Sequence, residues 1–149
     1  MTLPIVTTLN RSDGPPDAPT LSALSVVPLP PVNPTAYLLQ TAGQIGKPPP
    51  TTPSTPFPTS FHEQAANAFA NVGACLGLKG ATPRDITKIT IYVVNLNASH
   101  REPLIDVIRN FFRIEGQESH KPPSSLIGVA GLASPDFMIE VEATAVVAA

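Results

Sequence analysis

The alternation of apolar and polar residues is clearest after residue 59, where it predicts two helices. Residues 60–63 read Ser-Phe-His-Glu, the S-x-x-E form of a capping box that begins a helix. Apolar residues follow at helical spacing, and two glycines then mark the end: Ala65, Phe69, Val72, Leu76, Gly77 and Gly80. A second S-x-x-E sequence at 99–102 predicts another helix, with Pro103 in its first turn and with Leu104, Ile108 and Phe111 along its apolar side.

Strands are predicted on both sides of these helices. Residues 86–96 are rich in Ile, Thr, Tyr and Val, and residues 124–130 and 137–147 close the chain. In the last segment Ile139, Val141 and Ala143 alternate with Glu140, Glu142 and Thr144, so one strand face is apolar and the other acidic. Before residue 60, residues 21–27 and 36–45 predict two strands, and residues 3–9 a short first one.

Proline divides the chain. Fourteen of the 19 prolines lie at or before Pro58, concentrated in residues 28–34 and 48–58. Proline fixes φ and donates no hydrogen bond, so neither stretch can be a helix or a central strand. We therefore expect a mobile N-terminal segment at 1–16 and a single domain at 17–149, with a proline-rich loop at 46–59.

The order of elements is β-β-β-α-β-α-β-β, which predicts an α+β fold with both helices on one face of a mixed sheet. A monomer of this kind would leave the other sheet face uncovered. Burial of that face in an oligomer is the economical solution.

Composition narrows the function. The chain has 149 residues, a length that suits one domain, and a formal net charge of −2 without the clustered Lys and Arg of a duplex-binding surface. The longest apolar run, 126–133, is too short to span a membrane, and the first residues lack a signal-peptide pattern. We therefore expect a cytoplasmic protein with neither nucleic acid nor membrane as partner.

Metal and thiol chemistry are also disfavoured. Cys75 is the single cysteine, so no intrachain disulfide can form, and its place on the first helix predicts a small core residue. His62 and His100 each follow a helix start, where exposure is the rule, and His120 precedes the last two strands. These three histidines have no metal-ligand spacing, and no metal site is predicted.

Six blocks in order resemble the RidA/YjgF family, and together they cover the chain from about Ala18 to Val147. They are Gly43-Gln44-Ile45, the pairs Gln64-Ala65 and Asn71-Val72, residues 85–96, Phe111-Phe112, residues 122–130, and Ile139-Glu-Val-Glu-Ala143. The resemblance implies a chorismate-mutase-like fold assembled as a homotrimer, with an inner β-barrel and pockets at the subunit interfaces. Deaminases of the family hydrolyse 2-imino acids to 2-keto acids and ammonia without metal or cofactor. Relatives have also been described as endoribonucleases, which the net charge and the lack of an aromatic and basic stacking surface disfavour.

The family's pocket residues are only partly present in this chain. The glutamate that positions water falls on Glu140, and the glycine of the Ser-Gly pair falls on Gly43. The other positions are replaced: the carboxylate-binding arginine by Ser124, which Ser125 follows, the serine by Ala42, the tyrosine by Thr20 and the asparagine by Ile105. Arginine holds a carboxylate through two parallel charge-assisted bonds, and its loss costs roughly 2–5 kcal/mol of binding. Lys121 is a candidate replacement cation, and the apolar substitutions favour an uncharged ligand.

Glu140 is the predicted catalytic residue, because a carboxyl group in a largely apolar pocket has a raised pKa and can transfer protons. The alternative is a solvated or structural glutamate. Glu142 is expected to be structural or at the rim, and His120 to reach the pocket mouth.

Three functions remain open. The first is a cofactor-independent enzyme that acts through Glu140 on an uncharged imine, enamine or activated carbonyl compound, by hydrolysis, tautomerisation or cyclisation, including a biosynthetic tailoring step. The second is a 2-iminobutanoate/2-iminopropanoate deaminase with a substitute cation. The third is a non-enzymatic trimeric ligand-binding or chaperone-like protein.

Overall fold

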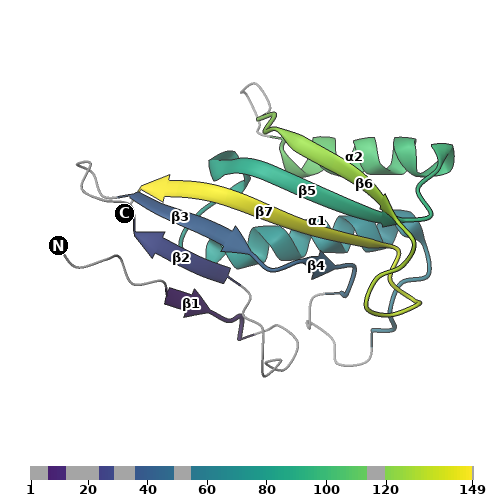
Figure 1. The fold of residues 1–149 in the computed structure, drawn as a ribbon, viewed down its shortest axis with the longest axis horizontal. Helices are drawn as coiled ribbons and strands as arrows, with labels where there is room; N and C mark the ends of the chain where they lie inside the picture. The colour runs from purple at the N-terminus through teal and green to yellow at the C-terminus, as the bar shows by residue number, and fades with distance from the viewer. Residues whose placement is uncertain (1–6, 13–23, 29–35, 49–54, 114–119, 149) are drawn as a thin grey trace.

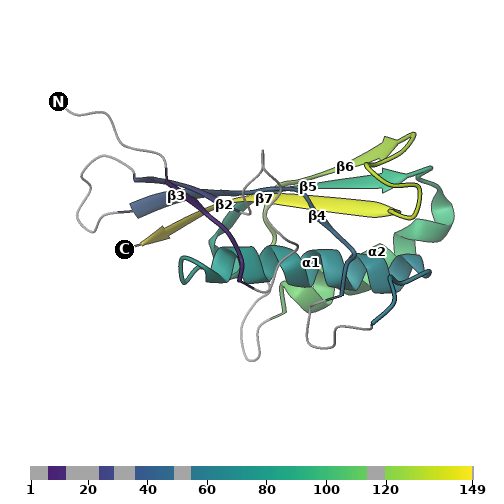
Figure 2. The same ribbon diagram turned by 90° about the horizontal axis from the view of Figure 1, so that it is seen from below.

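The computed structural model describes residues 7–12, 24–28, 36–48, 55–113 and 120–148. In this part of the chain a mixed seven-stranded sheet forms one layer, and two helices form a second layer against one of its faces (Figure 2). The helices are α1 (Phe61–Gly77) and α2 (Arg101–Phe111). The strands are β1 (Thr7–Leu9), β2 (Leu24–Pro28), β3 (Ala36–Thr41), β4 (Gln44–Ile45), β5 (Ile86–Val94), β6 (Ser124–Val129) and β7 (Ile139–Ala148). The predicted fold class is confirmed.

The C-terminal strand β7 lies in the middle of the sheet. The strand order is β1-β2-β3-β7-β5-β6, and β4 pairs with β7 beyond the end of β3 (Figure 1). All pairs are antiparallel except β5 with β6, which are connected through α2. Both edges of β7 are therefore paired with neighbouring strands, and its acidic residues lie near the centre of the sheet.

The predicted single strand over residues 36–45 is wrong in one respect, because it is interrupted at Ala42 and Gly43. Gln40 is opposite Thr144 and Gln44 is opposite Val141, so four residue steps on this segment match three on β7. One extra residue therefore lies off the ladder, as in a β-bulge. The hydroxyl of Thr41 accepts a hydrogen bond from the Ala143 N–H at 2.9 Å, which satisfies a backbone group beside the interruption.

Helix α1 begins as predicted, whereas α2 does not. The Ser60 side chain accepts a hydrogen bond from the Glu63 N–H at 3.2 Å. The second capping box is instead formed at Asn97: its side chain accepts from the Ser99 N–H, and the His100 ring accepts from the Asn97 N–H. A short 3-10 turn, Ala98–His100, therefore precedes α2, and the predicted Ser99–Glu102 box is not used. A second short 3-10 turn, Pro83–Asp85, precedes β5.

The core fills the space between the helices and the covered sheet face. Its largest fully buried apolar side chains come from both layers: Phe69, Leu76 and Val72 of α1, and Leu24, Leu39, Ile86, Ile89, Ile91, Val93, Ile139 and Val141 of the sheet. Cys75 is also buried, as predicted for a small core residue. Ile108 and Phe111 pack at the margin of this core, while Leu104 and Val107 are fully inside it.

Side-chain amides of α1 hold the segments that flank the sheet. Buried Gln64 donates to the carbonyls of Pro58 (2.8 Å) and Asp136 (2.9 Å) and accepts from the Met138 N–H (2.9 Å). Asn71 donates to the carbonyls of Ile45 (3.1 Å) and Lys47 (2.9 Å). These bonds fix β4 and the start of β7 relative to α1, and so position the residues between them.

The sheet face opposite the helices carries a mixture of polar and apolar side chains; we call it the open face. Strand pairing places Gln40, Lys88, Thr90, Tyr92, Ser125, Ile127, Glu140, Glu142, Thr144 and Val146 on it. Ile127 is 41% exposed and Val146 36% exposed. Among the described residues no helix is long and apolar enough to cross a membrane. The predicted domain boundary at residue 17 lies outside the described residues and stays a prediction.

Candidate functional site

Glu140 lies on the open face where β7 runs beside β4. Its cross-strand partners are Tyr92 on β5 and Ile45 on β4. The carboxyl group reaches over Gly43 so closely that a Cβ at residue 43 would collide with Oε1 and with the side-chain carbons behind it. The two residues that the resemblance predicted as retained pocket positions therefore contact each other, and the glycine makes room for the carboxyl group.

The environment of Glu140 favours its protonated form. Partial burial, followed by the negative charge of Glu142 two residues along the strand, raises the pKa of Glu140 above the ordinary glutamate value. A carboxyl group of this kind can donate a proton nearer to neutral pH and take it back afterwards. Such an exchange is what general acid–base catalysis requires.

Tyr92 is hydrogen-bonded to Glu142 and lies beside Glu140 on the neighbouring strand. Its hydroxyl donates a hydrogen bond to Glu142 Oε1 at 3.0 Å, while its backbone is in register with Glu140. The hydrogen bond to Glu142, partial burial and the charges of Glu142 and Glu140 all raise the pKa of the Tyr92 phenol. Glu142 is thus half-buried and hydrogen-bonded on the open face, beside the predicted catalytic residue.

A shallow polar cavity continues from this group toward β3. It has a volume of about 250 Å³ and is lined by Gln40, Thr41, Lys88, Thr90, Glu142, Ala143 and Thr144. Lys88 donates to the Ser125 hydroxyl at 2.7 Å, so Ser125 also faces this side. The open face therefore carries carboxyl, ammonium and hydroxyl groups within a few residues of Glu140.

Ser124 lies in a different place, at the start of β6 against the C-terminal half of α2. A cavity of about 610 Å³ lies there, lined by Ile89, Asp106, Ile108, Arg109, Asn110, Phe112, Arg113, His120, Lys121, Pro122 and Ser124. His120 forms a hydrogen bond with the Ile86 carbonyl at 2.7 Å, and its ring packs edge-on against Phe112. This cavity combines an apolar floor with several cationic side chains.

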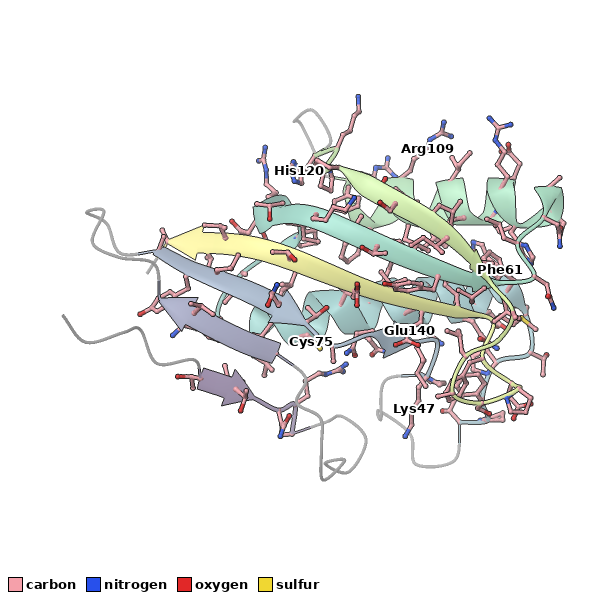
Figure 3. The ribbon with its side chains drawn as sticks, viewed as in Figure 1. Lys47, Phe61, Cys75, Arg109, His120 and Glu140 are labelled. Atoms are coloured by element: carbon pink, nitrogen blue, oxygen red, sulfur yellow. The ribbon has the colours of Figure 1, made fainter. Side chains whose placement is uncertain are left out.

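These two groups of residues do not meet within one chain. Ser124 pairs with Ile89, whose side chain points toward the helices, whereas Glu140 pairs with Tyr92 on the open face. Glu140 lies near β4 in Figure 3, while Arg109 and His120 lie across the sheet beyond β6. A single copy therefore presents two separate groups of predicted site residues, one at β4 and β7 and the other at β6 and α2.

Comparison with known proteins is consistent with this arrangement of elements. The model of the Endoribonuclease L-PSP family matches residues 22–147. The chain belongs to the Endoribonuclease L-PSP family. The predicted membership in the RidA/YjgF group is thereby confirmed.

Solved structures agree with this family assignment. A Vibrio vulnificus protein is 31% identical, with 95% of this chain and 100% of that chain covered and a TM-score of 0.69. Escherichia coli TdcF, solved with bound serine, is 23% identical over 95% and 99% of the two chains, with a TM-score of 0.73. Escherichia coli YjgF is 24% identical over 94% and 98%, with a TM-score of 0.70. No curated protein matches the chain in sequence.

The remaining predicted residues of this L-PSP family chain are scattered. Ala42 adjoins Gly43, and its carbonyl accepts a hydrogen bond from Gln44 at 3.1 Å. Ile105 is half-buried on α2 and does not line the cavity at Ser124. Thr20 lies outside the described residues. The roles of all these residues stay predictions.

The histidines away from Ser124 serve other contacts. His62 lies 3.0 Å from an Asp106 carboxylate oxygen, and both side chains are exposed. The His100 ring packs against Phe61 with ring centroids 4.5 Å apart. In the described part of the chain no group of three or more His, Cys, Asp or Glu residues could hold a metal ion.

The residues predicted from the sequence did not include Tyr92, Lys88 or the two arginines near Ser124, Arg109 and Arg113. Lys88, Thr90 and Tyr92 alternate with buried isoleucines, so the period of two could have placed them on the polar face of their strand. Arg109 lies in the last turn of α2 and Arg113 follows just after the end of that helix, so both lie at its C-terminal end. Their proximity to Ser124 depends on how α2 packs behind β6, which sequence spacing does not show.

Proposed function

We propose that the protein is a cofactor-independent enzyme in which the Glu140 carboxyl group transfers protons to and from a small, uncharged imine or enamine, or a comparably activated carbonyl compound. The observation that carries the proposal is the Glu140 carboxyl group itself: half-buried, seated over Gly43, and with its pKa raised by burial and by Glu142. Family membership supports a shared chemistry but does not name the substrate.

Imine hydrolysis illustrates how one carboxyl group can suffice. The protonated Glu140 donates its proton to the imine nitrogen, which makes the carbon electrophilic. Water then adds to that carbon, and the resulting carboxylate accepts a proton from the water. Transfer of this proton to the nitrogen lets the C–N bond break while the carboxylate takes the remaining hydroxyl proton, which releases an amine or ammonia and a carbonyl compound and restores the protonated Glu140. Tautomerisation of an enamine needs two proton transfers: Glu140 donates a proton to the enamine β-carbon, and its carboxylate then accepts the proton from the nitrogen.

The substrate class is inferred from the residues that replace the family's pocket residues in this chain. Ser124 replaces the arginine that would pair with a substrate carboxylate, and a hydroxyl offers one neutral donor in place of two charge-assisted ones. Ala42 and Ile105 also remove polar side chains from family pocket positions. These replacements favour a substrate without a carboxylate.

We further propose that the chain forms a homotrimer in which the residues around Glu140 of one copy and the residues around Ser124 of the next copy form one pocket. We call each of these two groups a half-site. The open face carries Ile127 and Val146, which are partly exposed in one copy, and β6 is an edge strand. Packing one copy's β6 edge beside the next copy's Glu140 would bring both half-sites to one pocket.

The Glu140→Gln variant tests the catalytic proposal. Glutamine keeps the shape but cannot exchange a proton, so imine hydrolysis should fall by about 100- to 10,000-fold. An amine oxidase acting on an uncharged primary amine supplies the imine in situ, and semicarbazide competes for it. Glu102→Gln, an exposed change on α2, is the matched control and should leave turnover unchanged. Full turnover by Glu140→Gln would contradict the proposal. Absence of turnover by the unmodified protein on every imine would favour a non-enzymatic ligand-binding or chaperone-like role.

A second candidate is a 2-imino acid deaminase with a substitute cation, and the cavity at Ser124 favours it. Arg109, Arg113 and Lys121 line that cavity together with Ser124. On this alternative, imino acids generated from amino acids by an amino acid oxidase are hydrolysed faster than uncharged imines. Arg109→Gln or Arg113→Gln then raises KM for the imino acid. If the first proposal holds, uncharged imines are hydrolysed faster than imino acids, and Ser124→Arg improves imino acid turnover.

A further inference from the structure

The open face places a second carboxyl group and a phenol beside the proposed acid. Glu140 and Glu142 are two residues apart on β7, so their side chains leave the same face with Cα atoms about 7 Å apart. Tyr92 is the direct cross-strand neighbour of Glu140, where side chains approach to about 5 Å, and its hydroxyl reaches diagonally to Glu142 at 3.0 Å. Tyr92 and Glu142 therefore form one hydrogen-bonded unit in contact range of Glu140.

We propose that Tyr92 and Glu142 are positioning residues for the acid chemistry of Glu140: the phenol holds the Glu142 carboxylate on the open face, so that its negative charge faces the Glu140 carboxyl group. This inference rests on the proposed function for its catalytic meaning. The effect of Tyr92 and Glu142 on the protonation of Glu140 can be measured without a substrate.

The charges around Glu140 are compatible with this arrangement. On β7 the neighbouring charge is Glu142, and on β5 the polar groups of the same face are Tyr92 and Lys88. Lys88 is hydrogen-bonded to Ser125 on β6, which directs its ammonium group to that side of the face. Lys47, after β4, is exposed. The neighbours on the same face of β3 and β4, Gln40 and Ile45, are uncharged.

The hydrogen bond from the Tyr92 hydroxyl determines where the Glu142 charge lies. An unrestrained glutamate on a half-exposed face samples several rotamers, many of which point into water, where its charge is screened. The hydrogen bond from Tyr92 removes that freedom and keeps the Glu142 charge close to Glu140. Phenylalanine at residue 92 would preserve the ring packing and remove only this restraint.

Nuclear magnetic resonance titration of the glutamate side-chain carboxyl carbons tests the proposal on the intact protein. We expect the pKa of Glu140 to fall toward the ordinary glutamate value in Glu142→Gln, because the neighbouring charge is gone. We expect a fall in the same direction in Tyr92→Phe, because the charge is no longer held in place. Tyr37→Phe, on β3, and Glu102→Gln, on α2, are matched controls that leave the Glu140 titration unchanged.

Either variant with an unaltered Glu140 titration overturns the proposal, since both members of the unit are required. If an imine substrate is found, the alkaline limb of the kcat/KM pH profile, where activity falls as Glu140 loses its proton, must move with the measured pKa in both variants. Loss of activity without that movement indicates a merely structural role and also overturns the proposal. If no substrate is found, the titrations still decide the proposal, so its failure is distinguishable from failure of the proposed function.

Discussion

At the scale of single residues, the absence of a side chain at Gly43 determines where the Glu140 carboxyl group lies. The glycine leaves a space that the glutamate carboxyl group occupies, and the neighbouring strands withdraw that group from water. Two predictions at the residue scale follow from this contact.

Gly43→Ala should move the Glu140 carboxyl group, because the added methyl group would occupy its position. We expect a stability loss of about 1–3 kcal/mol from overpacking. Turnover should fall by about 100-fold, as for a catalytic group misplaced by about 1 Å. Chemical denaturation and the imine assay measure the two effects. Gly77→Ala is the control, because the space around residue 77 is open and alanine is favoured in a helix. Unchanged turnover in Gly43→Ala would show that catalysis does not require the Glu140 carboxyl group to lie over residue 43.

The raised pKa of Glu140 should make stability depend on pH. The folded chain keeps this proton at pH values where the unfolded chain has lost it, so the free energy of unfolding falls as the pH rises from the ordinary glutamate value through the raised one. Glu140→Gln removes that loss. The variant should therefore gain stability relative to the unmodified protein at pH 8 but not near pH 3.5, which lies below the ordinary value of about 4.3. Urea unfolding at fixed protein concentration measures this difference, and an equal difference at both pH values would contradict it.

At the scale of elements, α1 organises the site through its amide side chains rather than through apolar packing alone. Gln64 joins the loop before α1 to the residues that begin β7, and Asn71 holds the residues that end β4. The bulge at Ala42 and Gly43 lies between β3 and β4, so these bonds also limit its movement.

Gln64→Ala should be strongly destabilising. It leaves the Met138 N–H and the carbonyls of Pro58 and Asp136 without their partner in a buried place, where each unsatisfied group costs about 1–3 kcal/mol. We expect a total loss of roughly 3 kcal/mol or more. Asn67→Ala removes one hydrogen bond, to Gly46, and should cost about 1 kcal/mol. Denaturant unfolding of both variants measures the difference, and equal losses would show that Gln64 does not have this role.

At the scale of the whole molecule, the sheet has one face covered by helices and one that is not. The open face combines polar groups around Glu140 with partly exposed Ile127 and Val146. The predicted site residues at Glu140 and at Ser124 are separated in one copy. The assembly proposed above, of copies through this face, would bring them together and cover the apolar side chains.

We therefore predict a homotrimer with three times the 15.6 kDa mass of one chain. Sedimentation at micromolar concentration should give that mass, and a monomer would contradict the proposed assembly. Ile127→Lys places a charge on the open face and should dissociate the trimer, because burying an unpaired charge is costly. Leu78→Lys, at the end of α1, changes a comparably exposed apolar residue off this face and should leave the mass unchanged.

The sequence by itself determined the kinds of elements, their apolar faces and the family, and the family resemblance marked Glu140 and Gly43 as candidate residues. The elements and their faces follow from local spacing, since side chains repeat every two residues in strands and about every 3.6 in helices, and the family follows from motifs. Only the tertiary structure decided the interruption at Ala42 and Gly43, the cap at Asn97, the bond from Tyr92 to Glu142, and the separation of Ser124 from Glu140. Each of these depends on strand register or on competition between neighbouring caps. The free energy that favours these features comes from contacts between segments far apart in the chain, and those contacts cannot be read from local periodicity.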